Sequence, residues 1–93
     1  MEVTFDPAKN SWNNRKRGLS FERAVDFDFE TAVYSLDRRH EYGEDRIIAL
    51  GYLDGRLHVI CFVETEAGIR VISLRKANFR EVKKYEKQKT VDQ

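Results

Sequence analysis

The sequence predicts an α+β fold with two N-terminal helices, an antiparallel sheet of about four strands and a C-terminal helix. Two apolar runs, residues 46–53 and Arg56–Glu64, are joined by Asp-Gly, the dipeptide most typical of a two-residue hairpin turn. Capping residues enclose a polar segment near the N-terminus, and basic residues recur at helical spacing near the C-terminus. Helices at the ends and strands between them pack as layers.

The N-terminal segment is expected to form a short strand and two helices. Residues Glu2–Phe5 alternate weakly between polar and apolar side chains, as a short strand does. Asp6 suits the N-cap of a helix, a proline follows it, and Gly18 suits the left-handed position after the last turn. A helix is therefore predicted over Pro7–Arg17. A second, short helix is predicted over residues 21–27, with a serine cap and apolar residues on its inner side.

The sheet is predicted from four runs rich in β-branched and aromatic residues. They are residues 31–36, 46–53, Arg56–Glu64 and 69–74. In the two middle runs apolar residues occupy alternate and intervening positions, which indicates central strands covered on both faces. Residues 78–89 then predict a helix with only a narrow apolar stripe, so we expect it to pack by one edge.

Composition indicates a folded protein. Of the 93 residues, 41% are hydrophobic and 35% charged, and no repeat or linker divides them, so a single domain over residues 1–93 is expected. The single cysteine, Cys61, excludes an internal disulfide and is expected to be a small buried hydrophobe. No segment has the length to span a membrane or the pattern of a signal peptide, so we expect a cytoplasmic protein without a membrane partner.

Charge is distributed unevenly along the chain. The net charge is +1, but residues 70–89 carry eight basic and two acidic side chains, whereas residues 21–54 carry nine acidic side chains and four arginines. One end of the molecule can therefore attract an anion that the middle repels. A solvated amphipathic helix would also explain the basic segment. Charge alone therefore does not identify a site, and candidate site residues are chosen by their places on the predicted strands and helix.

Several kinds of site have little support. His40 and His58 are 18 positions apart, without a pattern of cysteines or carboxylates around either, so no metal site is predicted. His40 is expected in a solvated loop. His58 lies within a strand, where hydrogen-bonded scaffold is the favoured interpretation and a contact to substrate the alternative. No glycine-rich phosphate loop is present and no serine has a histidine at a suggestive spacing, so neither a cofactor nor covalent hydrolase chemistry is implied.

The basic C-terminal segment offers a site for a phosphodiester. Arg70 lies on the last predicted strand, and Arg75 and Lys76 come directly after it, where the scaffold fixes their direction. Arg46 opens another strand, so Arg46 and Arg75 can address one pocket if these two strands are neighbours. Guanidinium forks grip phosphate oxygens at two points, while lysine supplies a point charge.

The predicted C-terminal helix could add contacts. Arg80 suits a phosphate, and Tyr85 could stack on a base. Free lysine, tyrosine and arginine are not ready bases at neutral pH, so the site would act by electrostatics, with Glu81 or His58 as the assisting proton acceptor. RNA brings its own attacking 2′-hydroxyl. The pattern therefore predicts slow, metal-independent RNA cleavage with loose sequence preference.

Two ordered motifs resemble the signatures of one family, the BrnT toxins. The first is "FDPAKNSWNNRKRGLSFERAVDFD", and the second runs from an acidic-Arg pair through "RVISLRKA" to a glutamate and a tyrosine. The residues that fit the first motif are Phe5, Asp6, Lys9, Asn14, Lys16, Gly18, Ser20, Phe21 and Ala24. The residues that fit the second are Asp45, Arg46, Gly51, Arg70, Ile72, Ser73, Arg75, Ala77, Glu81 and Tyr85. Together they cover nearly the whole chain in order.

The resemblance implies a RelE-like fold and an RNA-cleaving toxin of a bacterial type II toxin–antitoxin pair, which inhibits translation and growth. It also implies a BrnA-like antitoxin, a ribbon-helix-helix protein that dimerises, covers the toxin and binds operator DNA. The basic residues to which family toxicity is attributed would be Arg46 and Arg75, and the resemblance extends the site to Arg70, Lys76 and the acidic residue Glu81. The chain departs from the family at Arg17, where a histidine is usual, and at Leu74, where a small residue is common.

Two other functions are compatible with the residues. A non-catalytic module could use the same basic helix for phosphate contacts, in nucleic-acid binding or operon autoregulation. A protein-interaction domain could use it to meet an acidic segment of the antitoxin. RNA cleavage by the purified chain distinguishes a toxin enzyme from both.

Overall fold

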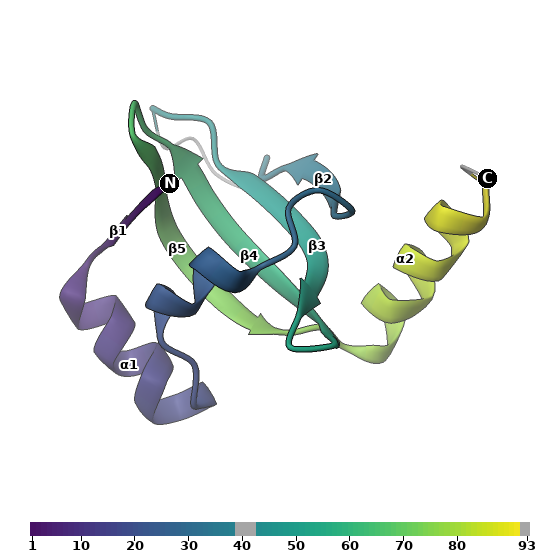
Figure 1. Cartoon of the computed structure of the whole chain (residues 1–93), viewed down its shortest axis with the longest axis horizontal. Helices are drawn as coiled ribbons and strands as arrows, with labels where there is room; N and C mark the ends of the chain where they lie inside the picture. Colours follow the sequence, from purple (N-terminus) through teal and green to yellow (C-terminus); the bar gives the residue numbers. More distant parts are fainter. Residues whose placement is uncertain (39–42, 92–93) are drawn as a thin grey trace.

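A computed structural model describes residues 1–38 and 43–91 (Figure 1). The solvated loop expected at His40 falls outside these residues. Along the chain the elements are β1 (Glu2–Phe5), α1 (Pro7–Arg17), the 3₁₀ helix η1 (Phe21–Asp26), β2 (Val33–Leu36), β3 (Ile47–Leu53), β4 (Arg56–Glu64), β5 (Gly68–Lys76) and α2 (Phe79–Val91). This content confirms the α+β class. None of the described helices combines the length and the hydropathy needed to cross a bilayer.

Within the described residues the sheet has five strands in the order β1-β5-β4-β3-β2, so the prediction of about four antiparallel strands is wrong in detail. β2 to β5 form the expected antiparallel succession, and Asp54 and Gly55 make the β3–β4 turn with positive φ at both residues. β1 adds a parallel edge strand that pairs Glu2 with Gly68. Local patterns do not reveal this pairing, because it joins two segments that are far apart in the sequence.

The N-terminal helices begin where their capping residues indicate. The Asp6 side chain accepts a hydrogen bond from an amide in the first turn of α1 (2.9 Å), and Gly18 takes the left-handed conformation (φ 66°) after the last turn. The second predicted helix exists, but it is a 3₁₀ helix that ends at Asp26. The Phe27 amide donates to the Ala24 carbonyl, the i to i+3 spacing typical of short connecting turns.

Apolar side chains cover both faces of the sheet, as predicted for its central strands. On one side, which we call the η1 face, Phe21 of η1 joins a buried cluster with Ile60 and Leu74. On the other side, the α2 face, Tyr85 of α2 joins a smaller cluster with Val59. The α2 face is less completely covered by helices, and most of the candidate site residues lie there.

Helix α2 packs against the sheet by one edge, as its narrow apolar stripe predicted. Val82 and Tyr85 contact the cluster on the α2 face, whereas Phe79 is 75% exposed. The Tyr85 hydroxyl donates to the Thr31 carbonyl (3.2 Å), and its ring meets Tyr52 edge-on. The rest of the helix extends away from the sheet (Figure 1). Only the inner edge of α2 therefore contributes to the core.

Candidate functional site

A β-bulge in β5 determines which of its basic side chains share a face. Arg70 and Arg75 are five residues apart, so in a regular strand they would point to opposite faces. The register shifts between Cys61 and Phe62 of β4, which leaves Ile72 as the extra residue of β5. Before the shift and after it, a residue directly next to the arginine belongs to the cluster on the η1 face. Each arginine side chain points to the opposite face. Both arginines therefore lie on the α2 face.

At one end of this face, Arg75 binds Glu81 of α2 in a two-point ion pair. Nη1 and Nη2 of Arg75 donate to Oε1 and Oε2 of Glu81, each at 2.8 Å, and Nη1 also lies 3.3 Å from the Lys76 carbonyl. The two side chains are 38% and 24% exposed, so the pair lies at the surface. A bidentate pair of this kind fixes the direction of the guanidinium.

Glu81 is itself held by the start of α2. Its Oε1 accepts a hydrogen bond from the Asn78 amide, and the Asn78 side chain accepts one from the Glu81 amide, both at 2.9 Å. This arrangement is a capping box, in which the N-cap and the third helical residue satisfy each other's amides. Arg75 is therefore oriented by a carboxylate whose own position is set by the helix.

The same contacts fix the ionisation of Glu81. The hydrogen bond from Arg75 lowers the pKa of the Glu81 carboxyl most, partial burial opposes it, and the Asn78 amide and the charges of Arg75 and Lys84 lower the pKa further. A carboxylate with a lowered pKa is a weak proton acceptor. The geometry of Glu81 is that of an anchor for Arg75 and gives no support to the expected role as a base.

Glu81→Gln is expected to lower stability at neutral pH and to have little effect in acid. The pKa of Glu81 is lower in the folded chain than its ordinary value of 4.5, so the ionised carboxylate stabilises the fold above that pH. This contribution is lost as the pH falls through the folded-state pKa. Urea unfolding at about pH 7 and about pH 3 measures the change. Exposed Glu86→Gln, on the same helix, is the control, and an equal deficit of Glu81→Gln at both pH values would contradict the prediction.

At the other end of the α2 face, Glu44 joins Arg46 and Arg70. Nη2 of Arg70 donates to Glu44 Oε1 at 2.5 Å, and Nε of Arg46 lies 3.9 Å from the same oxygen. Arg46 precedes Ile47, which packs on the η1 face, so alternation directs Arg46 toward the α2 face. The Arg46 side chain is 17% exposed and that of Arg70 is 41% exposed. Two guanidinium groups thus share one carboxylate, and Arg70 is the more accessible of the two.

The two clusters do not form one pocket. β4 separates β3 from β5, so the condition under which Arg46 and Arg75 could address one pocket is not met. Ile47, next to Arg46, lies opposite Phe62 near the end of β4, whereas Arg75 lies opposite Val59, nearer its start. The arginines therefore mark opposite ends of the α2 face.

The other four predicted site residues lie apart from these clusters. Lys76 is exposed, but alternation along β5 directs it away from Arg75 to the η1 face. His58 is 4% exposed with Nδ1 2.8 Å from a carbonyl of its own strand, and Tyr85 is 6% exposed, so neither presents its ring to a substrate. Arg80 is exposed in the first turn of α2. Of the predicted set, the structure pairs Arg75 with Glu81 and brings Arg46 and Arg70 together.

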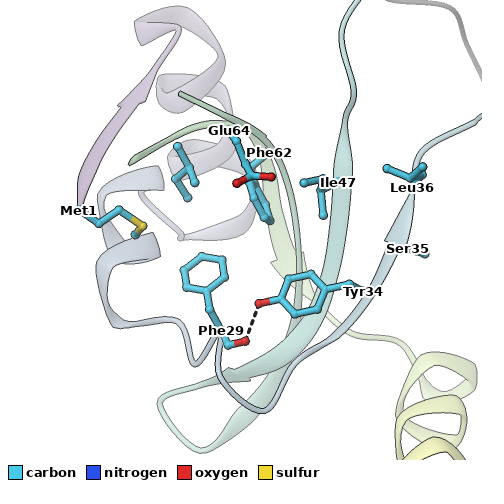
Figure 2. A pocket seen from close by; sticks show the side chains of 9 residues that line it. Met1, Phe29, Tyr34, Ser35, Leu36, Ile47, Phe62 and Glu64 are labelled. Atoms are coloured by element: carbon cyan, nitrogen blue, oxygen red, sulfur yellow. Dashed lines mark hydrogen bonds between the residues drawn. The ribbon is translucent and has the colours of Figure 1, made fainter. Parts of the chain in front are cut away.

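Two hollows differ in their chemistry. The larger, about 600 Å³, opens on the η1 face and is lined mainly by apolar side chains such as Tyr34 and Phe62, with the carboxylate of Glu64 among them (Figure 2). That lining does not suit a phosphate. The smaller, about 60 Å³, lies on the α2 face beside Glu81 and Lys84. Of these two hollows, the one on the α2 face is the better candidate for an anionic ligand, because a lysine is part of its lining.

Metal ligands are not grouped in the part of the chain that the structure describes. There, no set of three or more His, Cys, Asp or Glu side chains is placed to hold a metal ion. The cationic side chains of the α2 face are the groups that can balance a phosphate charge.

Sequence reasoning missed two members of the site. Glu44 lies in a polar segment, and no local pattern links it to Arg70, which it reaches from 26 residues away. Lys84, one of the basic residues of the C-terminal segment, lines the small hollow with Glu81. Its i+3 spacing from Glu81 on a predicted helix was the available signal.

A comparison with protein-family models identifies the family of the chain. The model described as a ribonuclease toxin, BrnT, of type II toxin–antitoxin system matches residues 5–81, which include both arginine clusters. No curated protein sequence matches the chain. The family match spans most of the 93 residues and confirms the family resemblance; it covers the first motif and the second as far as Glu81. The chain belongs to the BrnT family of ribonuclease toxins of type II toxin–antitoxin systems.

Proposed function

We propose that this chain is an endoribonuclease toxin that cleaves RNA without a metal ion and inhibits translation and growth in the bacterial cytoplasm. Family membership implies a ribonuclease toxin, an RNA substrate and a protein antitoxin. The observation that carries the proposal is the shared face of Arg70 and Arg75. Two guanidinium groups on one rigid strand can hold separate phosphates of a single RNA strand.

Arg75 is the proposed residue for stabilising the transition state. A guanidinium has five N–H donors, and Glu81 takes one from each of two nitrogens, which fixes the plane of the group. A fixed cation stabilises the negative charge that develops on a pentacoordinate phosphorus without the reorganisation that water would need. Glu81 is the positioning residue for this cation.

RNA supplies the nucleophile. The 2′-oxygen forms a bond to phosphorus while the bond to the 5′-oxygen breaks, which gives a 2′,3′-cyclic phosphate and a 5′-hydroxyl end. Water accepts the proton of the 2′-hydroxyl and gives one to the 5′-oxygen, because Glu81 is a weak base and His58 is buried. The enzyme is therefore slow, and its rate depends on charge and position.

The remaining basic residues are proposed to bind the RNA backbone. Arg46 and Arg70 hold it at the far end of the α2 face, and Arg80 extends the positive surface at the start of α2. We assign His58 and Tyr85 to the scaffold, because each is more than nine-tenths buried.

Purified protein incubated with single-stranded RNA in EDTA tests the activity. We expect cleavage to continue in EDTA and to stop when every 2′-hydroxyl of the RNA is methylated. If the RNA stays intact both in the reaction with EDTA and in a parallel reaction with Mg²⁺, the proposed activity is overturned. Cleavage that requires Mg²⁺ would overturn only its metal independence.

The proposed partner is a BrnA-like antitoxin with a ribbon-helix-helix domain. It would dimerise, cover the toxin and connect it to operator DNA, so that this chain contacts the operator indirectly. Coexpression with the product of the adjacent reading frame should give one complex in which RNA cleavage is blocked. An adjacent product that neither co-purifies nor blocks cleavage would contradict this assignment.

The ion pairs favour a non-catalytic function as the alternative. Glu44 and Glu81 partly neutralise the arginines, and the pair between Arg75 and Glu81 also fastens α2 to β5. A module that binds nucleic acid or a partner protein in operon autoregulation needs only such a partly neutralised basic surface and no catalytic group. RNA binding that weakens with salt, without cleavage at any protein concentration, would establish it.

A further inference from the structure

A second cluster of basic and aromatic side chains lies on α1. Trp12, the single tryptophan of the chain, is 45% exposed on this helix. The helix carries no acidic residue and four basic ones: Lys9, Arg15, Lys16 and Arg17. Exposed aromatic rings among cations are the features with which proteins bind unpaired nucleic acid. Neither arginine cluster of the α2 face includes these residues.

Arg17 is positioned over Trp12. Its guanidinium carbon lies 5.0 Å from the centre of the indole ring, within the range of a cation–π contact. Its Nη1 also donates to the side-chain oxygen of Asn13 at 2.9 Å. These two contacts hold the charge of Arg17 beside the ring while much of the ring stays exposed.

Asn13 ties this pair to the sheet. It is 1% exposed, and its side-chain amide donates to the carbonyls of Leu19 and Leu74, both at 2.9 Å. Leu74 belongs to β5, so α1 is fixed against the strand that carries Arg70 and Arg75. An aromatic–cation pair on a fixed helix needs little ordering when a ligand binds.

A hollow beside Trp12 reaches β5 between its two face-sharing arginines. It has a volume of about 180 Å³, and its lining includes Lys9, Trp12 and Arg17 of α1 and Ile72 and Ser73 of β5. Among the described residues that line it, two are basic and none is acidic. A strand of RNA that crosses β5 at Ser73 would therefore contact α1 directly after the α2 face.

We propose that this hollow is a binding subsite for single-stranded RNA, in which a base stacks on Trp12 while Lys9 and Arg17 contact the flanking phosphates. The inference rests on the proposed function, because it extends the RNA path from the α2 face across β5 to α1. Single-stranded RNA fits because its base faces are open for stacking, whereas a duplex hides them. Every base has a π-face, so the subsite adds affinity without a strict sequence preference.

The fluorescence of Trp12 reports directly on the subsite, because the chain has no other tryptophan. The probe is a 2′-O-methyl RNA of about 12 nucleotides without internal base pairing, which binds and is not cleaved. We expect the unlabelled probe to quench Trp12 emission over the concentration range in which the anisotropy of a labelled copy rises. Binding without a change in Trp12 emission would overturn the subsite.

Substitutions separate stacking from folding. Trp12→Ala should weaken binding of the probe roughly 5- to 100-fold, whereas Trp12→Phe, which keeps a ring, should lose much less. Arg17→Gln should reduce the salt dependence of binding, because one phosphate contact is removed. Thermal melts check the fold of each variant. If Trp12→Ala does not fold, the affinity of Trp12→Phe and the quenching of the unmutated protein decide whether the subsite exists. If Trp12→Ala folds and binds the probe as tightly as the unmutated protein does, the subsite is overturned.

The outcomes also separate this inference from the proposed activity. Quenching by the probe without cleavage of unmodified RNA supports the subsite and overturns the activity. Cleavage without quenching overturns the subsite alone. If Trp12→Ala loses antitoxin binding while it binds the probe normally, the surface of α1 belongs to the protein partner and the subsite is overturned.

Discussion

Arg75→Gln is expected to slow RNA cleavage at least about 100-fold, the usual effect of removing one preorganised charge from a developing anion. Arg75→Lys keeps the charge but cannot make the two bonds to Glu81, so we expect an intermediate rate. Single-turnover cleavage of one RNA oligonucleotide, with protein in excess, measures the rate without product release.

Loss of the anchor between α2 and β5 is the competing explanation for such a result. Arg56→Gln, at an exposed position where β4 begins, is the matched control and should keep the unmutated rate. Glu81→Gln weakens the same anchor but keeps the cation, so it should lose less activity than Arg75→Gln. Arg75→Gln that cleaves at the unmutated rate would contradict the proposed role of Arg75. Equal losses in Arg75→Gln and Glu81→Gln would assign the effect to α2.

Elements whose boundaries are encoded locally could be predicted from the sequence. Asp6 and Gly18 set the ends of α1, and both perform the expected capping roles even though the helix contains several asparagines. Asp54 and Gly55 likewise set the β3–β4 hairpin, because their positive φ values match the twist of the two strands. In both cases the information lies within a few residues of the feature.

The arrangement of the candidate site could not be predicted in this way. The bulge at Ile72 puts Arg70 and Arg75 on one face, and nothing in the spacing of the residues indicates where a strand gains an extra residue. The insertion of β4 between β3 and β5 separates Arg46 from Arg75. The grouping of charges thus depends on pairing between distant segments, which local patterns do not record.

Burial of polar side chains is equally invisible in the sequence. His58 and Tyr85 were reasonable candidates for contacts with RNA, but both are buried and each side chain lies within hydrogen-bond distance of a main-chain carbonyl, so they belong to the scaffold. Asn13 shows the opposite case. It gave no signal as one of several asparagines in a polar helix, yet it is among the most deeply buried side chains of the structure.

Asn13→Ala is therefore expected to lower the free energy of unfolding by about 2–4 kcal/mol, because it removes the donor that satisfies two carbonyls. The Leu74 carbonyl bonded by Asn13 belongs to β5, in the part of the strand beyond its pairing with β1. A buried carbonyl without a donor loses its hydration and gains nothing in return. The same substitution also removes the acceptor that holds Arg17.

Asn14→Ala is the matched control for this prediction, because the neighbouring asparagine is exposed. Alanine has the higher helix propensity, and both substitutions gain that advantage equally, so the difference between them isolates the side-chain contacts of Asn13. Urea unfolding should place Asn14→Ala within about 0.5 kcal/mol of the unmutated protein. If Asn13→Ala unfolds at the same urea concentration as Asn14→Ala, the amide of Asn13 does not hold α1 to the sheet, and the fixed position of Arg17 beside Trp12 loses its structural basis.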